Sequence, residues 1–218
     1  MAHIAVADTI TIPVGGGELG ADLKVPEHAL GLVIFAHGSG SSRFSRRNRA
    51  VAEYLGRHRF ATLLLDLLTR QEDAIDARTA EYRFDIDRLG ERVILAIDWA
   101  RQRDDLVKLP VGCFGASTGA AAALIGAAAR PSAVKAVVSR GGRPDLAGSA
   151  LAGVAAPTLL IVGGDDEPVI EMNRDAMKHL PGVAELEIVP GATHLFEEPG
   201  TLEQVMSLAS RWFEKYLR

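Results

Sequence analysis

Short apolar runs alternate with segments of helical periodicity along most of the chain. Continuous apolar runs of four to seven residues are typical of strands covered on both faces, whereas apolar residues spaced three and four apart are typical of amphipathic helices. The runs predict six buried strands, at residues 32–36, 61–65, 111–114, 134–139, 158–162 and 184–188. The periodic segments predict helices at residues 49–56, 86–101, 118–129, 169–180 and 202–216.

Two further runs, at residues 9–13 and 18–24, precede the first buried strand, and a glycine triplet at 15–17 separates them. Short strands joined by such a turn predict a β-hairpin, which we expect at an antiparallel edge of the sheet. Strands that alternate with helices form a mostly parallel sheet with helices on both faces. The pattern therefore predicts an eight-stranded α/β domain over residues 1–218.

Composition narrows the class of partner. The chain has 218 residues, 48% of them apolar, and a formal net charge of −4, which argues against nucleic acid or an anionic membrane surface. Its single cysteine, Cys113, falls inside a predicted strand and is interpreted as a small core residue. The N-terminal residues lack the basic and long apolar regions of a secretory signal, and no apolar run reaches membrane-spanning length. We expect a cytoplasmic protein that requires no metal or organic cofactor.

Polar residues follow the predicted strands at the edge where ligands bind in such sheets, beyond the carboxyl ends of the strands. A serine, an acid and a histidine each follow a different strand. They are Ser117, then Asp165 or Asp166, then His194. Of the six histidines, only His194 follows the last strand after the serine. Their order along the chain is compatible with a nucleophile, an orienting acid and a general base.

The chemistry of acyl transfer needs all three groups. A serine hydroxyl is a poor nucleophile unless an imidazole takes its proton, and a carboxylate then orients the imidazole. Backbone amides must also bind the oxyanion that forms, and the amide of Thr118 and one from the loop at 38–40 are candidates. The alternative for Ser117 is a helix N-cap, because a helix is predicted to begin directly after it.

The segment Gly115-Ala116-Ser117-Thr118-Gly119 resembles the nucleophile elbow of the α/β-hydrolase family. Residues 163–169 resemble its acid turn and residues 191–194 its histidine loop, and the likeness extends over nearly the whole chain. Within the family the chain is similar to small dienelactone-hydrolase-like proteins. Dienelactone hydrolases proper use a cysteine nucleophile, whereas this sequence has a serine in the elbow.

The resemblance implies a hydrolase of carboxylic esters, with thioesters and lactones as related substrates and a small molecule as the partner. Ser117 is then the nucleophile and His194 the base. The family spacing G-x-x-D-x-x-V favours Asp166 as the acid and leaves Asp165 as a turn residue. It also makes His37 a residue that braces the glycine-rich loop. The second oxyanion donor is Ser39 or, alternatively, Gly40.

Two segments of the sequence indicate how far the site is covered. Residues 140–157 are too few for the cap domain that this fold often inserts there, so we expect none. The polar stretch 69–83 is expected to cover the site only in part.

Several arginines are also candidates. Arg140 and Arg143 are candidates to bind a substrate carboxylate, although an ion pair with Asp66, Asp145 or Asp165 is the favoured interpretation. A basic cluster at Arg43, Arg46, Arg47 and Arg49 is interpreted as the solvated start of a helix, although its position beyond the glycine-rich loop would also allow it to attract anionic substrates.

Two other classes remain as alternatives. The segment at 114–121 also resembles the glycine turn of short-chain dehydrogenases, which would make the chain a nicotinamide-dependent oxidoreductase. However, more than a hundred residues precede this turn, and no tyrosine is followed by a lysine four residues on. Arg140 also stands where an acid would bind the adenosine ribose, although an arginine would suit a phosphorylated cofactor. The third class is a catalytically inactive hydrolase fold used for binding, which the complete set of serine, acid and histidine disfavours.

Overall fold

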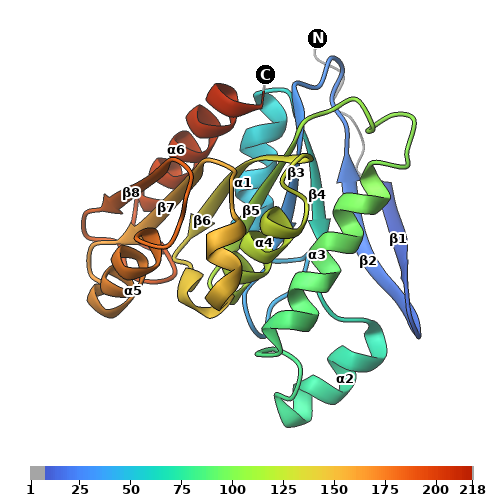
Figure 1. The fold of residues 1–218 in the computed structure, drawn as a ribbon, viewed down its shortest axis with the longest axis horizontal. Helices are drawn as coiled ribbons and strands as arrows, with labels where there is room; N and C mark the ends of the chain where they lie inside the picture. The colour runs from blue at the N-terminus through green and yellow to red at the C-terminus, as the bar shows by residue number, and fades with distance from the viewer. Residues whose placement is uncertain (1–7, 218) are drawn as a thin grey trace.

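The computed structural model describes residues 8–217 and contains one eight-stranded sheet, in the order β1-β2-β4-β3-β5-β6-β7-β8 (Figure 1). The strands are β1 (Asp8–Val14), β2 (Gly17–Lys24), β3 (Gly31–Ala36), β4 (Phe60–Leu65), β5 (Val111–Ala116), β6 (Val134–Arg140), β7 (Thr158–Gly163) and β8 (Ala184–Val189). β1 and β2 form an antiparallel hairpin, β2 pairs antiparallel with β4, and the other pairs are parallel. The predicted α/β-hydrolase architecture is confirmed. Of the histidines considered above, His3 lies outside the described residues.

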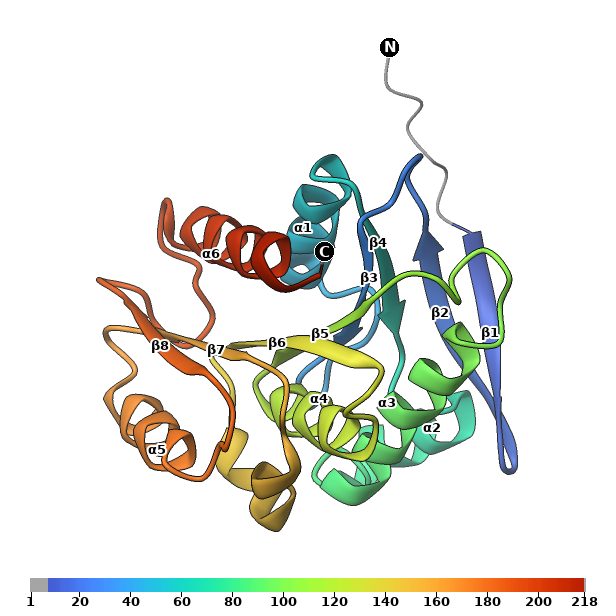
Figure 2. The ribbon, with the colours of Figure 1, turned by 45° about the horizontal axis from the view of Figure 1, so that its top comes forward.

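Helices cover both faces of the sheet. α1 (Arg46–Arg57) and α6 (Thr201–Tyr216) lie on one face, and α3 (Ile86–Ala100), α4 (Thr118–Ala129) and α5 (Glu167–Met177) lie on the other (Figure 2). A 3₁₀ segment, η1 (Pro144–Gly153), follows β6 in place of a cap domain. Within residues 8–217, no helix has the length and apolarity needed to cross a bilayer.

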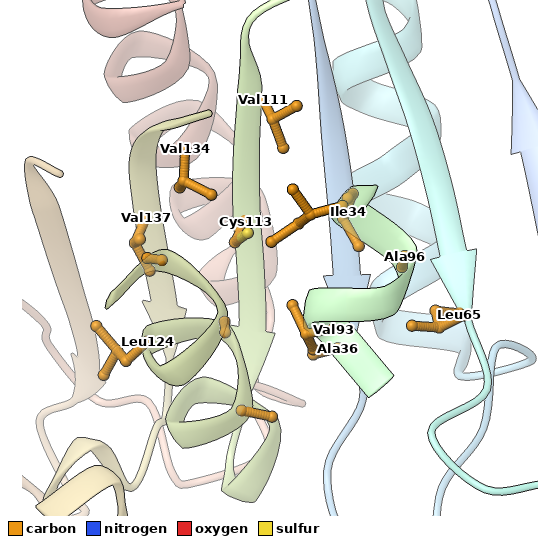
Figure 3. Close-up of a cluster of buried hydrophobic side chains, with 14 of the residues drawn as sticks. Ile34, Ala36, Leu65, Val93, Ala96, Val111, Cys113, Leu124, Val134 and Val137 are labelled. Atoms are coloured by element: carbon orange, nitrogen blue, oxygen red, sulfur yellow. The ribbon is translucent and has the colours of Figure 1, made fainter. Parts of the chain in front are cut away.

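The core is built from the buried strands and the apolar stripes of the helices. Ile34 of β3, Cys113 of β5 and Val93 of α3 belong to the cluster between the sheet and the helices α3 and α4 (Figure 3). Cys113 is fully buried, and burial raises the pKa of its thiol to about 12. This agrees with the prediction of a core residue, because a thiol with a raised pKa carries little of the reactive thiolate.

The polar stretch after β4 forms a helix that the hydrophobic pattern does not predict. α2 (Arg70–Thr79) begins at a capping box, in which Thr69 accepts from the amide of Glu72 and Glu72 accepts from the amide of Thr69. The helix buries almost no apolar surface, so periodicity gave no signal. The Thr-x-x-Glu spacing of the capping box is the sequence signal that could have found it.

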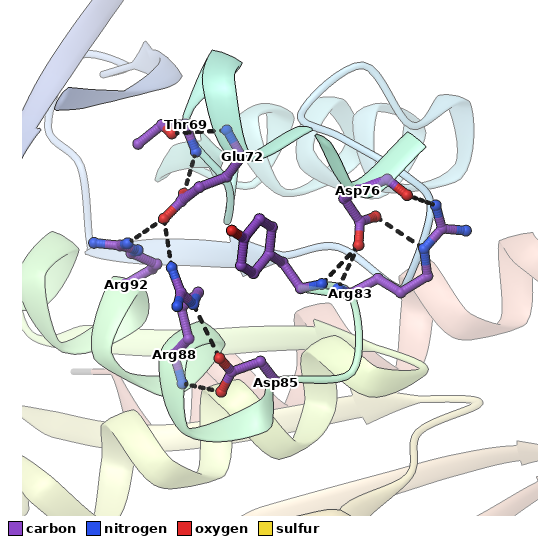
Figure 4. Close-up of polar contacts among 8 residues, drawn as sticks. Thr69, Glu72, Asp76, Arg83, Asp85, Arg88 and Arg92 are labelled. Atoms are coloured by element: carbon purple, nitrogen blue, oxygen red, sulfur yellow. Dashed lines mark hydrogen bonds and ion pairs between the residues drawn. The ribbon is translucent and has the colours of Figure 1, made fainter. Parts of the chain in front are cut away.

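Polar contacts hold α2 against α3. Glu72 accepts hydrogen bonds from Arg88 and Arg92 of α3, at 2.7 and 2.8 Å (Figure 4). Asp76, which is 3% exposed, accepts from the Arg83 side chain and from the amides of Tyr82 and Arg83. These contacts fix the segment beside the carboxyl end of β4.

Candidate active site

The turn that connects β5 to α4 has a strained backbone at Ser117, with φ 51° and ψ −124°. A positive φ is rare for a residue with a side chain and marks a position that its surroundings hold in place. The two flanking glycines show why the turn is so tight. A Cβ added at Gly115 would overlap Ala120, and one added at Gly119 would overlap the carbonyl oxygens of Ala36 and His37. The turn therefore requires glycine on both sides of the serine.

Ser117 occupies the N-cap position of α4, but its side chain makes no capping hydrogen bond. Its Oγ lies instead 3.3 Å from Nε2 of His194. An N-cap serine would direct its oxygen to an amide of the first helical turn. The N-cap interpretation of this hydroxyl is therefore wrong.

Backbone contacts from the turn after β6 hold the strained serine. The Ser117 amide donates to the Arg140 carbonyl at 3.3 Å, and the Arg143 amide donates to the Ser117 carbonyl at 3.0 Å. Asn173 of α5, which is fully buried, donates through Nδ2 to the Gly142 carbonyl at 2.9 Å. Sequence reasoning missed Asn173. The sequence offered one indication of this role: Asn173 is a polar residue four positions after Val169, on the face of α5 that is buried.

The acid and the histidine approach each other from the ends of β7 and β8. Oδ2 of Asp166 lies 2.6 Å from Nδ1 of His194, which is within hydrogen-bond distance. The acid turn and the histidine loop are also tied by the Asp165 amide, which donates to the Ala192 carbonyl at 3.0 Å. Gly163 allows this approach, since a Cβ there would overlap the Ala192 carbonyl. Asp166, rather than Asp165, thus places its carboxylate against the imidazole.

The histidine loop is fixed by its own hydrogen bonds. Glu198 accepts from the hydroxyl of Thr193 at 2.6 Å and from its amide at 3.1 Å. The hydroxyl bond is the main reason why the pKa of Glu198 lies below its ordinary value. Phe196, 2% exposed, anchors the loop in the core between the sheet and α6. The residue next to Thr193 is His194, so these contacts restrict the position of the imidazole.

The glycine-rich loop after β3 lies against the nucleophile. A Cβ added at Gly38 would be 3.0 Å from the Cβ of Ser117. Within residues 8–217, the amides of Thr118, Ser39 and Gly40 donate no hydrogen bond. Free amides beside a serine hydroxyl are the feature that an oxyanion site requires.

His37 braces this loop rather than taking part in the serine–histidine pair. Its Nδ1 lies 2.8 Å from the Gly38 carbonyl, and its Nε2 accepts from the Leu67 amide at 3.1 Å. Burial lowers the pKa of His37, so the neutral ring is favoured in the folded protein. Both ring nitrogens are occupied by backbone groups, as the bracing interpretation expects.

The predicted arginine contacts divide into two cases. Arg143 forms a bidentate ion pair with Asp145, at 2.9 and 2.7 Å, as the favoured interpretation expected. Arg140 is 5% exposed, and no carboxylate among the described residues lies within ion-pair distance of it. The predicted ion pair is therefore wrong for Arg140. Asp66, one of its expected partners, pairs with Arg43.

The basic cluster at the start of α1 is less solvated than predicted. Arg43 and Arg49 both contact Asp22 of β2, and Arg47 pairs with Glu197 at 2.9 Å. Arg46 is exposed, as predicted for a solvated helix start.

A cleft of about 700 Å³ lies on the far side of the glycine-rich loop from β5. Its lining includes His37, Ser41 and Ser42 of that loop, Asp66 after β4, and Thr69 at the start of α2. It therefore extends from the loop toward α2 and the hairpin. No group of three or more histidine, cysteine or acidic side chains with metal-binding geometry occurs between residues 8 and 217.

Comparison with solved structures finds the same architecture at both high and low sequence identity. The crystal structure of a dienelactone hydrolase from Anabaena variabilis is 56% identical, covers 99% of this chain and 100% of its own, and superimposes with a TM-score of 0.97. Est1E from Butyrivibrio proteoclasticus is 19% identical over 95% of this chain and 98% of its own, with a TM-score of 0.78, which shows a shared fold.

Two curated relatives from Mycobacterium tuberculosis are longer proteins. Each is 56% identical over 206 residues, which are 94% of this chain and 44% of the relative, and each bears the name "Putative phosphoribosyl transferase". The chain thus spans less than half the length of these relatives, whose name describes the longer proteins.

The family assignment rests on a match over most of the chain. The model of the dienelactone hydrolase family matches residues 19–216, from β2 to the end of α6. The predicted likeness to this family is confirmed, and the oxidoreductase alternative is not supported. The chain belongs to the dienelactone hydrolase family.

Proposed function

We propose that this protein is a serine hydrolase that cleaves carboxylic esters of small molecules through an acyl-enzyme intermediate. The observation that carries the proposal is the line from Ser117 Oγ to His194 Nε2 at 3.3 Å and from His194 Nδ1 to Asp166 Oδ2 at 2.6 Å. Serine–histidine distances are often long in enzymes without substrate and shorten when the substrate is bound.

The proposed reaction begins when Ser117 Oγ attacks the ester carbonyl carbon. His194 Nε2 accepts the hydroxyl proton, and Asp166 stabilises the resulting imidazolium. When the tetrahedral intermediate collapses, His194 returns the proton to the departing alcohol and the acyl group remains on Ser117. A water molecule then gives a proton to His194 and attacks the acyl carbon. The bond from that carbon to Ser117 Oγ breaks, His194 returns the proton to Oγ, and the carboxylic acid is released. Each step uses side chains of this chain and water.

The oxyanion is assigned to the amides of Thr118 and Ser39, with Gly40 as the alternative second donor. The support is that these amides are free and that the Gly38 loop lies against Ser117. Thr118 is the first residue of α4, so its amide also stands at the positive end of the helix dipole. The same arrangement serves thioesters and lactones, because they share the tetrahedral intermediate.

Of the two arginines considered for substrate binding, we keep only Arg140 as a candidate substrate-binding residue. The Arg143 guanidinium is already engaged by Asp145, whereas Arg140 has no acid to balance it among the described residues.

Hydrolysis of p-nitrophenyl acetate by the wild type and by Ser117→Ala tests the proposal. We expect turnover by the wild type and a loss of about 10⁶-fold in kcat for the variant, the order found when a triad nucleophile is removed. Mass spectrometry of the wild type after brief reaction is expected to find an acetyl group on Ser117. Turnover by Ser117→Ala within tenfold of the wild type would refute the assignment.

A further inference from the structure

Arg140 is a buried cation that lacks a balancing acid. It ends β6, and its Nη2 donates to Oδ1 of Asn48 in the first turn of α1 at 3.1 Å. Its Nε is buried and has no hydrogen-bond partner among the described residues. Burial, with the neighbouring charge of Arg47, lowers the pKa of Arg140 to about 10. A buried guanidinium normally has a carboxylate or several acceptors, so this one is available to bind an anion.

The start of α1, next to Arg140, is also strongly positive. The N-terminal turn of a helix has free amides and the positive end of the dipole, and acidic side chains are favoured there. In α1 the Ser45 hydroxyl accepts from the Asn48 amide, which leaves the amides of Arg46 and Arg47 without a partner among the described residues. α1 has no acid in its first turn and carries Arg46 and Arg47 instead. The Nε of Arg47 is buried and has no partner within residues 8–217, and its only ion pair is with Glu197, which is 65% exposed. Among the described residues, Arg47 is thus balanced only by a solvent-exposed carboxylate, and Arg140 is balanced by none.

We propose that Arg140, Arg47 and the first turn of α1 form an anion site that binds a phosphate group of the substrate. Two guanidinium groups and the amides of a helix N-terminus offer more hydrogen-bond donors than the two oxygens of a carboxylate can accept, whereas a phosphate group presents three oxygens to them. Phe196 contributes an apolar wall, with the Arg140 guanidinium 5.9 Å from the centre of its ring.

The site lies beside the proposed catalytic residues. The histidine loop connects the two: Phe196, whose ring faces the Arg140 guanidinium, and Glu197, which pairs with Arg47, follow His194 by two and three residues. The Arg140 carbonyl also accepts from the Ser117 amide. The inference rests on the proposed function in one respect, since the phosphate is assigned to the molecule whose ester is cleaved. The substrate class is then a carboxylic ester that also carries a phosphate monoester, which is bound and left intact.

Binding of inorganic phosphate tests the site without relying on catalysis. We would titrate Ser117→Ala protein with phosphate by calorimetry, alone and with Arg140→Met, Arg140→Lys or Arg47→Met added. Loss of a charge-assisted hydrogen-bonding group is expected to weaken phosphate binding by about 10- to 100-fold in Arg140→Met and Arg47→Met, and less in Arg140→Lys. Arg57→Met is the matched control, because it removes an exposed charge from the last turn of the same helix and is expected to change binding by less than about threefold.

The outcomes separate this inference from the proposed function. Failure of the Ser117→Ala protein to bind phosphate, binding that is unchanged by both Arg140→Met and Arg47→Met, or acetate binding as tight as phosphate binding would each overturn the phosphate site. None of these results depends on ester cleavage. Conversely, phosphate binding lost in both arginine variants would support the site even if p-nitrophenyl acetate were not hydrolysed. Circular dichroism of each variant checks folding, and Arg47→Met serves if Arg140→Met does not fold.

Discussion

Two polar regions at the carboxyl end of the sheet contrast sharply, although both are rich in arginine. In the network between α2 and α3, Arg83, Arg88 and Arg92 each meet a carboxylate (Figure 4). Around the β5–α4 turn, Ser117 has a strained backbone and Arg140 has no carboxylate partner among the described residues. The first region has its charges paired, and the second has free donors and a buried charge.

The contrast indicates which region serves stability and which serves chemistry. Paired charges with lowered carboxyl pKa values favour the folded state and leave little capacity to bind a ligand. Strain and unpaired polar groups cost stability, and they persist where the surrounding structure holds them for a function. We therefore expect substitutions at the β5–α4 turn and its partners to change turnover, and substitutions in the α2–α3 network to change the free energy of unfolding.

After the nucleophile itself, the largest effect is expected at the acid that faces His194. Asp166→Asn would remove the charge that orients and stabilises the imidazole, and kcat for p-nitrophenyl acetate is expected to fall by about 10⁴-fold. Asp165→Asn is the matched control, since the Asp165 side chain makes no hydrogen bond among the described residues, and a change of less than about threefold is expected. A larger loss in Asp165→Asn than in Asp166→Asn would reverse the assignment.

A smaller effect, on stability, is expected at Glu72. Its carboxylate accepts from Arg88, Arg92 and the Thr69 amide, so Glu72→Gln would leave donors unpaired and lower the free energy of unfolding by about 1–3 kcal/mol. That corresponds to a fall in Tm of about 2–4 °C per kcal/mol for a chain of this size. Turnover per folded molecule is expected to stay the same.

A control variant and a pH series sharpen the Glu72 experiment. Glu171→Gln breaks an exposed ion pair with Arg174 and is expected to cost less than about 1 kcal/mol. Burial alone would raise the pKa of Glu72, but the Thr69 amide, Arg92 and Arg88 together lower it below the ordinary 4.5. The contribution of its charge is therefore complete above pH 4.5 and is lost as the pH falls through the lowered value. A stability difference that did not shrink in acid would contradict this explanation.

The smallest effect is expected at His37, which supports the glycine-rich loop. Burial lowers the pKa of His37 below the ordinary 6.5, so the unfolded chain binds a proton more readily than the folded one. The free energy of unfolding is then expected to fall as the pH drops below 6.5, by at most about 1.4 kcal/mol per pH unit from this group. Urea unfolding of His37→Gln at several pH values is expected to show a shallower dependence. An unchanged slope would mean that His37 is not the titrating group.

The sequence by itself determined the layers of the fold and the order of the candidate catalytic residues. Apolar runs and helical periodicity depend on neighbours close in the chain, so they predicted every strand of the sheet. The same local logic placed Ser117 between two glycines and His194 after the last strand. It failed at α2, where a capping box and ion pairs, rather than an apolar stripe, support the helix.

Only the tertiary structure decided which polar groups meet. Asp165 and Asp166 are adjacent in sequence, and the hydrogen-bonded turn beside β8 is what sends one carboxylate to His194 and leaves the other free. Arg140 was expected to pair with an acid, yet it lies against Asn48, 92 residues away. Such contacts join side chains from distant loops, and their geometry depends on how the whole sheet twists and packs, which no local pattern of residues records.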